Sequence, residues 1–419
     1  MARSSRSGGR CLAAATVLLL AVLGCSGSPG APQQDPGRRA NPATPLAEPS
    51  TAPEGLPPAP LSVAPPALPV PEPGVDSQAT DGARFLAGMA GGPDAPFDHL
   101  RQLPFWQEHA RHLNAQWEGF VERRLKPVRR FGQAELTAAE RASPRVLYPF
   151  GGPDLVFADA LFPHSPDLVL AGLEPLGALP DLGRRDAPRL VTALRQLRAS
   201  LVPALGLGYF ITEQMEEQRA EARFPGVLPL LFVFLARTGH EISSVQRVAV
   251  DPDGGIGPAV GPGDGLVPGV VIRCRRPGEP LRLVAYFQVD LRDAALGRDD
   301  RFARLVRRRG VAVTLLKCAS YLLHEARFST LRHLVLEGSS TVIQDPSGLP
   351  FRAFDPTHWS LSLYGNFQQP IPRFAHRPQP DLRRSFATTG TVGTLDFRTG
   401  YQSSLTRSSL LVARRRSEW

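Results

Sequence analysis

The chain has 419 residues, of which 48 are basic and 39 are acidic, for a formal net charge of +9. The basic residues include only two lysines, Lys126 and Lys317, and the arginines are scattered along the chain. The densest clusters, 307–309 and 414–416, are short and have no interleaved aromatic residues that could stack on bases. Composition therefore argues against a nucleic-acid partner, and an attraction to anionic lipid or polymer remains open.

Residues 1–25 are typical of a targeting segment. Three arginines precede an apolar run over 11–23, which is too short to span a bilayer stably. The run ends in the sequence VLGC at 22–25, which resembles the lipobox of bacterial lipoproteins, although valine stands where leucine is usual. The resemblance implies cleavage before Cys25 and acylation of that residue, hence a membrane partner through a lipid anchor. An ordinary secretory signal peptide is the alternative.

Residues 26–82 are expected to form a disordered linker. Fifteen of the 43 prolines lie between 26 and 80, and no aromatic residue does. Such a segment buries too little apolar surface to offset its ordering entropy. We expect a spacer of polyproline II and coil, with a proline-rich docking ligand as the alternative.

The remaining residues, 83–419, are expected to form a single domain. Apolar residues recur at helical spacing over 104–125. Residues 145–148 and 167–172 then read as strands on either side of a glycine turn and a short helix that ends near 162. This order predicts a βαβ unit with parallel strands.

The second half of the domain is predicted to be richer in strand, after a helix near 190–202 and an apolar element at 226–237. Residues 269–275 and 281–289 flank a Pro-Gly turn as a hairpin. Helices are expected at 299–309 and 316–336, and a final hairpin or antiparallel extension at 341–343 and 359–363. Together these elements predict an α/β fold with a mixed sheet, a Rossmann-like βαβ unit and packed helices.

Two carboxylates of the βαβ unit are the candidate catalytic residues. Asp154 follows the turn Gly151-Gly152-Pro153, and Glu174 follows the second strand. The carboxyl ends of parallel strands meet at one edge of a sheet, where α/β proteins hold their sites. An envelope glycan or peptide hydrolase could use the two carboxyls as acid and base. Alternatively, Asp154 only complements the start of its own helix.

A glycine turn, a helix and an acid after the second strand also resemble the first βαβ unit of S-adenosylmethionine-dependent methyltransferases. The resemblance implies a nucleotide-binding edge, with Glu174 on a ribose. The departures are Pro153, which lacks an amide hydrogen, and the carboxylate of Asp154, which would repel phosphate. The βαβ pattern therefore predicts the fold, and no bound cofactor is expected. An inactive methyltransferase-like body is one functional alternative.

Other polar residues give weaker patterns. His324, Glu325 and Asp345 could meet in acid–base or metal chemistry, but no ligand spacing supports a metal site. Cys274 and Cys318 could pair in an oxidising compartment or remain buried thiols. No cofactor or metal is predicted.

The segments YPFGGPD, GLEP, SSTVIQDPSGLP and LYGNF resemble those of a family of uncharacterised exported bacterial proteins. The resemblance covers roughly 145–375 and implies one continuous domain without bringing an activity. We therefore expect a lipid-anchored protein of the cell envelope, on the periplasmic or outer surface. Its body is expected to bind or organise an envelope polymer or protein.

Overall fold

A computed structural model describes residues 74–419, except for 184–186, 209–225, 260–266, 403 and 417–419. The predicted signal segment, Cys25 and nearly all of the predicted linker lie outside the described residues. The described fold begins with helix α1 (Ser77–Leu86), which is capped by the side chain of Asp76. Thr80 is buried in that helix, so the folded body starts before the boundary expected at residue 83.

Within the described residues, ten strands form one sheet in the order β4-β3-β5-β6-β2-β1-β7-β8-β10-β9. The strands are β1 (Arg145–Pro149), β2 (Asp167–Gly172), β3 (Glu241–Val250), β4 (Ile256–Pro258), β5 (Val267–Arg275), β6 (Arg282–Gln288), β7 (Ala312–Leu316), β8 (Ser339–Gln344), β9 (Trp359–Gly365) and β10 (Ser409–Arg415).

The centre of the sheet is doubly wound. Strands β6, β2, β1, β7 and β8 are parallel neighbours, and β10 runs antiparallel between β8 and β9. Numbered in chain order, these five parallel strands lie in the order 3-2-1-4-5, which matches the first five positions of dinucleotide-binding α/β sheets. Strands β5, β3 and β4 extend the sheet beyond β6, each antiparallel to its neighbour, with β3 between β5 and β4. The expected α/β class and mixed sheet are confirmed.

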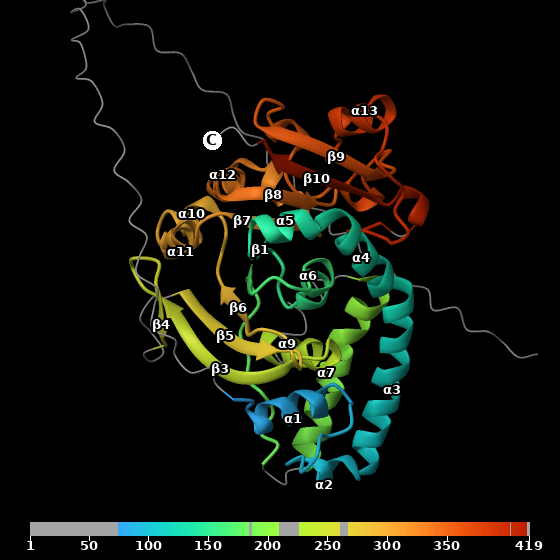
Figure 1. The fold of residues 1–419 in the computed structure, drawn as a ribbon, viewed down its shortest axis with the longest axis vertical. Helices are drawn as coiled ribbons and strands as arrows, with labels where there is room; N and C mark the ends of the chain where they lie inside the picture. The colour runs from blue at the N-terminus through green and yellow to red at the C-terminus, as the bar shows by residue number, and fades with distance from the viewer. Residues whose placement is uncertain (1–73, 184–186, 209–225, 260–266, 403, 417–419) are drawn as a thin grey trace, which may run out of the picture. The chain divides into compact units, whose positions relative to one another are not determined.

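The described helices are α1, α2 (Asp98–Arg101), α3 (Pro104–Phe120), α4 (Lys126–Phe131), α5 (Thr137–Ala142), α6 (Leu155–Leu161), α7 (Ala187–Leu207), α9 (Val227–Arg237), α10 (Asp293–Leu296), α11 (Arg301–Arg309), α12 (Ser329–Gly338) and α13 (Pro380–Thr388). They cover the two faces of the sheet (Figure 1). Helices α1, α3, α4, α6, α7 and α9 share one apolar core with Val146 and Tyr148 of β1. Helices α10 to α13 share the other core with Leu147.

The sequence of each element explains its place. The central strands are apolar on both faces, as parallel strands buried between two helix layers must be. Helix α9 is buried along its length from Val227 to Ala236, which an apolar surface on every side requires. Helix α3 begins with Pro104, whose missing amide hydrogen costs nothing in the first turn.

The structure confirms the βαβ unit of β1, α6 and β2 and the hairpin of β5 and β6. Two expectations were wrong. The helix expected at 316–336 is the end of β7, two 3₁₀ turns and then α12, because 312–316 is a fully buried strand. The hairpin expected between 341–343 and 359–363 does not form, since β10 lies between β8 and β9. The alternative, an antiparallel extension, is present, because β10 pairs antiparallel with both strands.

Candidate functional site at the carboxyl edge of the sheet

The winding of the sheet places a switch point between β1 and β7. From β1 the chain passes through α6 to β2 on one side, whereas β7 pairs with β1 on the other side. Helix α6, which follows β1, and helix α12, which follows β7, lie on opposite faces, so the chain leaves the two strand ends in opposite directions. Such a divergence opens the crevice in which α/β sheets bind ligands.

The turn after β1 is tight and partly left-handed. Phe150 has φ +61° and Gly152 has φ +50°. The amide of Gly151 bonds to the carbonyl of Tyr148, and the amide of Asp154 bonds to the carbonyl of Gly151. Asp154 is the N-cap residue of α6, yet its side chain makes no capping hydrogen bond. Its carboxylate is therefore directed away from its own helix start.

The Asp154 carboxylate forms a buried ion pair at the switch point. Lys317, which directly follows β7, lies with its Nζ 2.6 Å from Oδ2 of Asp154, and the Tyr148 hydroxyl donates to the same oxygen at 2.9 Å. The Lys317 ammonium also donates to the carbonyl of Gly208 at 2.6 Å and lies 4.0 Å from the centre of the Phe157 ring. Asp154 and Lys317 are 5% and 8% exposed, so water screens the pair little.

Burial and charge set the protonation of this cluster. Burial raises the pKa of Asp154, and Lys317 and Tyr148 oppose that rise. Burial disfavours the charge on Lys317, but Asp154, together with Cys318 and Asp345, outweighs it, so the pKa of the ammonium is raised. The pKa of Tyr148 is raised well above its usual value by burial and by Asp154. The ammonium of Lys317 and the hydroxyl of Tyr148 therefore favour the carboxylate form of Asp154, in opposition to its burial.

The Glu174 side chain lies against the same turn, at Gly152. The Tyr286 hydroxyl donates to the Glu174 carbonyl at 2.8 Å and lies 3.2 Å from Oε2 of its carboxylate. A Cβ atom added at Gly152 would lie 3.3 Å from that carboxylate, and one added at Gly172 would lie 2.2 Å from Oε2. The two glycines therefore leave the space that the Glu174 side chain occupies.

The loop after β7 is left-handed at several positions. Cys318, Ser320 and Tyr321 all have φ between +53° and +58°. The buried Asp345 supports this loop from the end of β8, accepting from the amide of Cys318 at 2.6 Å and from the hydroxyl of Ser347 at 2.6 Å. Left-handed backbone at non-glycine residues is costly and concentrates at functional sites.

The structure brings together only some of the residues that the sequence analysis grouped as candidate sites. Asp154 and Glu174 both adjoin the turn, but the Asp154 carboxylate is directed inward to Lys317. The cavity beside Lys317, also lined by Asp345, measures about 20 Å³, room for about one water molecule. Glu325, considered with His324 and Asp345, instead pairs with Arg327 and Arg377.

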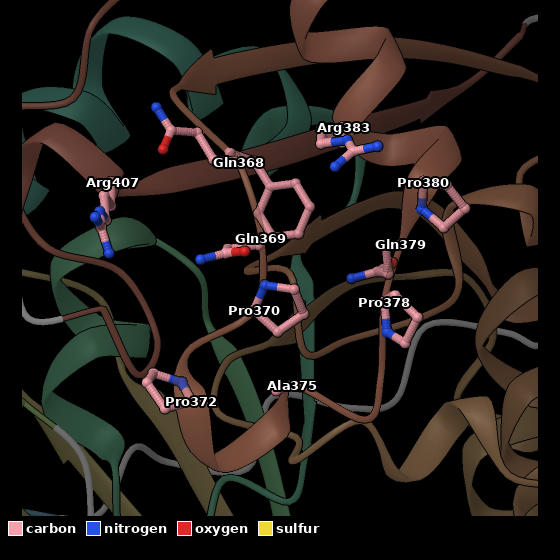
Figure 2. Close-up of a pocket in the computed structure, with 11 residues that line it drawn as sticks. Gln368, Gln369, Pro370, Pro372, Ala375, Pro378, Gln379, Pro380, Arg383 and Arg407 are labelled. Carbon is pink, nitrogen blue, oxygen red and sulfur yellow. The ribbon is translucent and has the colours of Figure 1, made fainter.

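A larger cavity opens at the same edge of the sheet, beyond β8 and β9. It measures about 470 Å³ and is lined mainly by glutamines, prolines and two arginines, Arg383 and Arg407. Figure 2 shows Arg407 beside the amide of Gln369 on one side of the hollow and Arg383 above Pro380 on the other. This volume lies within the range of small-molecule sites.

The described residues contain no group of three or more His, Cys, Asp and Glu side chains placed to hold a metal ion. Cys274 and Cys318 are free thiols, so the disulfide considered for them is not formed. Within the described part of the chain, no helix is both long and apolar enough to cross a membrane.

Comparison of the chain with protein-family models and with curated protein sequences found no match.

Sequence reasoning missed three contributors to this edge, Lys317, Tyr148 and Tyr286. Lys317 had one visible signal: it is one of two lysines in an arginine-rich chain and ends an apolar run. The tyrosines lie inside apolar strands, where nothing local distinguishes a hydroxyl that donates to a carboxylate from one that only packs.

Proposed function

We propose that this chain is an envelope-anchored lipoprotein whose α/β body binds an envelope molecule at the membrane surface without transforming it. The lipobox-like sequence at Cys25 supports the anchor, and the proline-rich linker supports a spacer between anchor and body. The observation that supports the binding role is that the buried Asp154–Lys317 ion pair occupies the switch point between β1 and β7. Asp154 and Lys317 neutralise each other there, and the accessible cavity at the same edge lacks an acid–base pair.

A non-catalytic role fits the state of these groups. A general acid or base must reach the proton that it transfers. The Asp154 carboxylate is buried and held by two donors, while the cavity of about 470 Å³ is lined by amides, guanidinium groups and proline rings. These groups can orient a ligand through hydrogen bonds and charge.

The test compares binding with turnover on the purified full chain. Envelope glycan and peptide fragments are incubated with wild type, Asp154→Asn and Glu174→Gln, and the mixtures are analysed by mass spectrometry. We expect retained fragments of unchanged mass with all three proteins. Cleavage by wild type that is lost in both variants would replace the proposal with the hydrolase alternative. That alternative is supported by the position of Glu174 beside the Asp154 turn.

The anchor is tested separately by metabolic labelling with a radioactive fatty acid. We expect label on the wild-type chain and none on Cys25→Ser, with wild type alone in the membrane fraction. Equal labelling of the two chains, or no label on either, would leave the ordinary signal peptide as the better reading.

The methyltransferase-like alternative is supported by the strand order, which extends the nucleotide-binding pattern beyond one βαβ unit. The Glu174 carboxylate beside Gly152 fits the ribose-binding acid that this alternative requires, whereas the missing amide hydrogen of Pro153 argues against a nucleotide phosphate at the turn. Titration of the full chain with S-adenosylmethionine separates the readings: we expect no heat of binding, and saturable binding would favour a methyltransferase.

A further inference from the structure

The cavity of Figure 2 is built where three strand ends meet, and we call it the β8–β10 cavity. Phe367 and the residues after it follow the end of β9 at Gly365, and Arg407 precedes the start of β10 at Ser409. Gln379 donates from Nε2 to the carbonyl of Pro346, just beyond β8, at 2.6 Å. Because β10 runs opposite to β8 and β9, all three ends lie at the carboxyl edge of the parallel sheet, the edge that carries ligand sites in this class of fold.

The walls of the cavity are fixed by packing and backbone constraint. Phe367 and Gln379 are 2% and 8% exposed, and Phe367 packs against Phe386 of α13 at 6.2 Å between ring centres. Four of the eleven lining residues are prolines, whose backbone φ is fixed. A cavity held in this way loses little conformational entropy when a ligand enters.

The charge of the cavity is positive and unbalanced. Arg383 and Arg407 line it, and no aspartate or glutamate does. Among the described residues neither arginine forms a salt bridge, although the neighbouring Arg384 pairs with Asp381 at 3.4 Å. Helix α13 begins at Pro380 in the same wall, so its positive end adds to the potential. Two unpaired guanidinium groups around one hollow are a site for an anion.

The other residues that line the cavity determine which kind of molecule can carry the anionic group. Three glutamines can donate to and accept from hydroxyl groups, while the proline rings and Phe367 offer apolar surface to carbon–hydrogen faces. Two guanidinium groups match the charge of a phosphate monoester, between about −1.5 and −2, better than that of one carboxylate. The volume of about 470 Å³ accommodates a small polyol or sugar with such a group.

We infer that the β8–β10 cavity binds a phosphate monoester carried on a small hydroxylated carbon skeleton, with Arg383 and Arg407 on the phosphate. This inference rests on the proposed binding role and names its ligand class. The source of the phosphate is either a free sugar phosphate or the headgroup of a phosphorylated lipid.

The test is calorimetric titration of the purified full chain, in neutral detergent at low salt, with three probes: glucose 6-phosphate, dihexanoyl phosphatidylinositol 4-phosphate below its micellar concentration, and inorganic phosphate. We expect saturable binding of at least one organic probe, and the tighter one identifies the source. Arg383→Gln and Arg407→Gln should each weaken binding about tenfold or more, as expected for loss of a charge-assisted hydrogen bond. Arg383→Lys should recover part of the loss.

The control is Arg384→Gln, which removes a charge from the same helix outside the cavity and should leave the affinity within about twofold. An equal loss in the control, tight binding of inorganic phosphate alone, or no effect of the two cavity variants would overturn the assignment. Mass spectrometry of the titrated probes distinguishes a failure of the proposed non-catalytic function from a failure of the proposed phosphate site. Release of phosphate would contradict binding without turnover and leave the site standing. Failure of every probe, in a chain that still retains envelope fragments, would remove only the site.

Discussion

The substitution Lys317→Met tests the buried pair directly. It keeps most of the side-chain volume but leaves the Asp154 carboxylate with only the Tyr148 hydroxyl, in a site that is 5% exposed. Removing one partner of a buried ion pair typically costs about 3–5 kcal/mol, because the remaining charge is uncompensated. We expect a loss of that size in the free energy of unfolding of the full chain, measured by urea denaturation at pH 7.

The pH dependence gives the same experiment a second readout. Burial already raises the pKa of Asp154, and loss of Lys317 removes the attraction that opposes that rise. A carboxyl whose folded pKa lies above its unfolded value of about 3.9 destabilises the fold as pH rises through that window. The deficit of Lys317→Met should therefore shrink as the pH is lowered from 7 to 4.5.

The chain offers a matched control in its other lysine. Lys126 pairs with Glu122 at 2.6 Å, but the two side chains are 53% and 62% exposed, so Lys126→Met should change stability by less than about 0.5 kcal/mol. A deficit below 1 kcal/mol for Lys317→Met, or one that is equal at both pH values, would refute the account of the buried pair.

Three further predictions concern neighbouring groups. Gly172→Ala should push the Glu174 carboxylate aside, because the new Cβ would lie 2.2 Å from Oε2; the protein should fold, and the displacement is visible in a crystal structure. Tyr286→Phe should lower the free energy of unfolding by about 1 kcal/mol through loss of the hydroxyl bond to Glu174, as measured by urea denaturation. Burial raises the pKa of Cys274 to about 12, so iodoacetamide at pH 8 should leave this thiol unmodified in the folded protein and modify it after unfolding, as read by peptide mass spectrometry.

The first βαβ unit could be predicted because its signals are local. β1 and β2 are continuous apolar runs, and glycines and a proline separate the first run from α6. β7 could not be recognised in the same way. Its five buried residues continue into the apolar stretch that follows, where periodicity does not distinguish a short buried strand from a helix.

The candidate site was only half accessible to sequence reasoning. The position of Asp154 after a glycine turn was visible, but its partner Lys317 is 163 residues away, and the pairing depends on β7 lying beside β1. The β8–β10 cavity needs three strand ends at one edge, which follows from a strand inserted out of chain order. Neither the pairing of Asp154 with Lys317 nor the meeting of the three strand ends produces a recognisable pattern in a short stretch of sequence.

The insertion of β10 between β8 and β9 also governs the order in which the sheet can close. Among the described residues, β9 pairs along its length with β10 and otherwise makes only an isolated bridge to Gly393, and β8 has β10 as its outer neighbour. During synthesis, the edges of β8 and β9 that pair with β10 therefore stay unpaired until residues 409–415 have been made. Contacts between segments distant in sequence slow folding, and an open strand edge can pair with other chains. A chain shortened before residue 409 should leave the outer edge of β8 open and aggregate rather than lose only a peripheral strand.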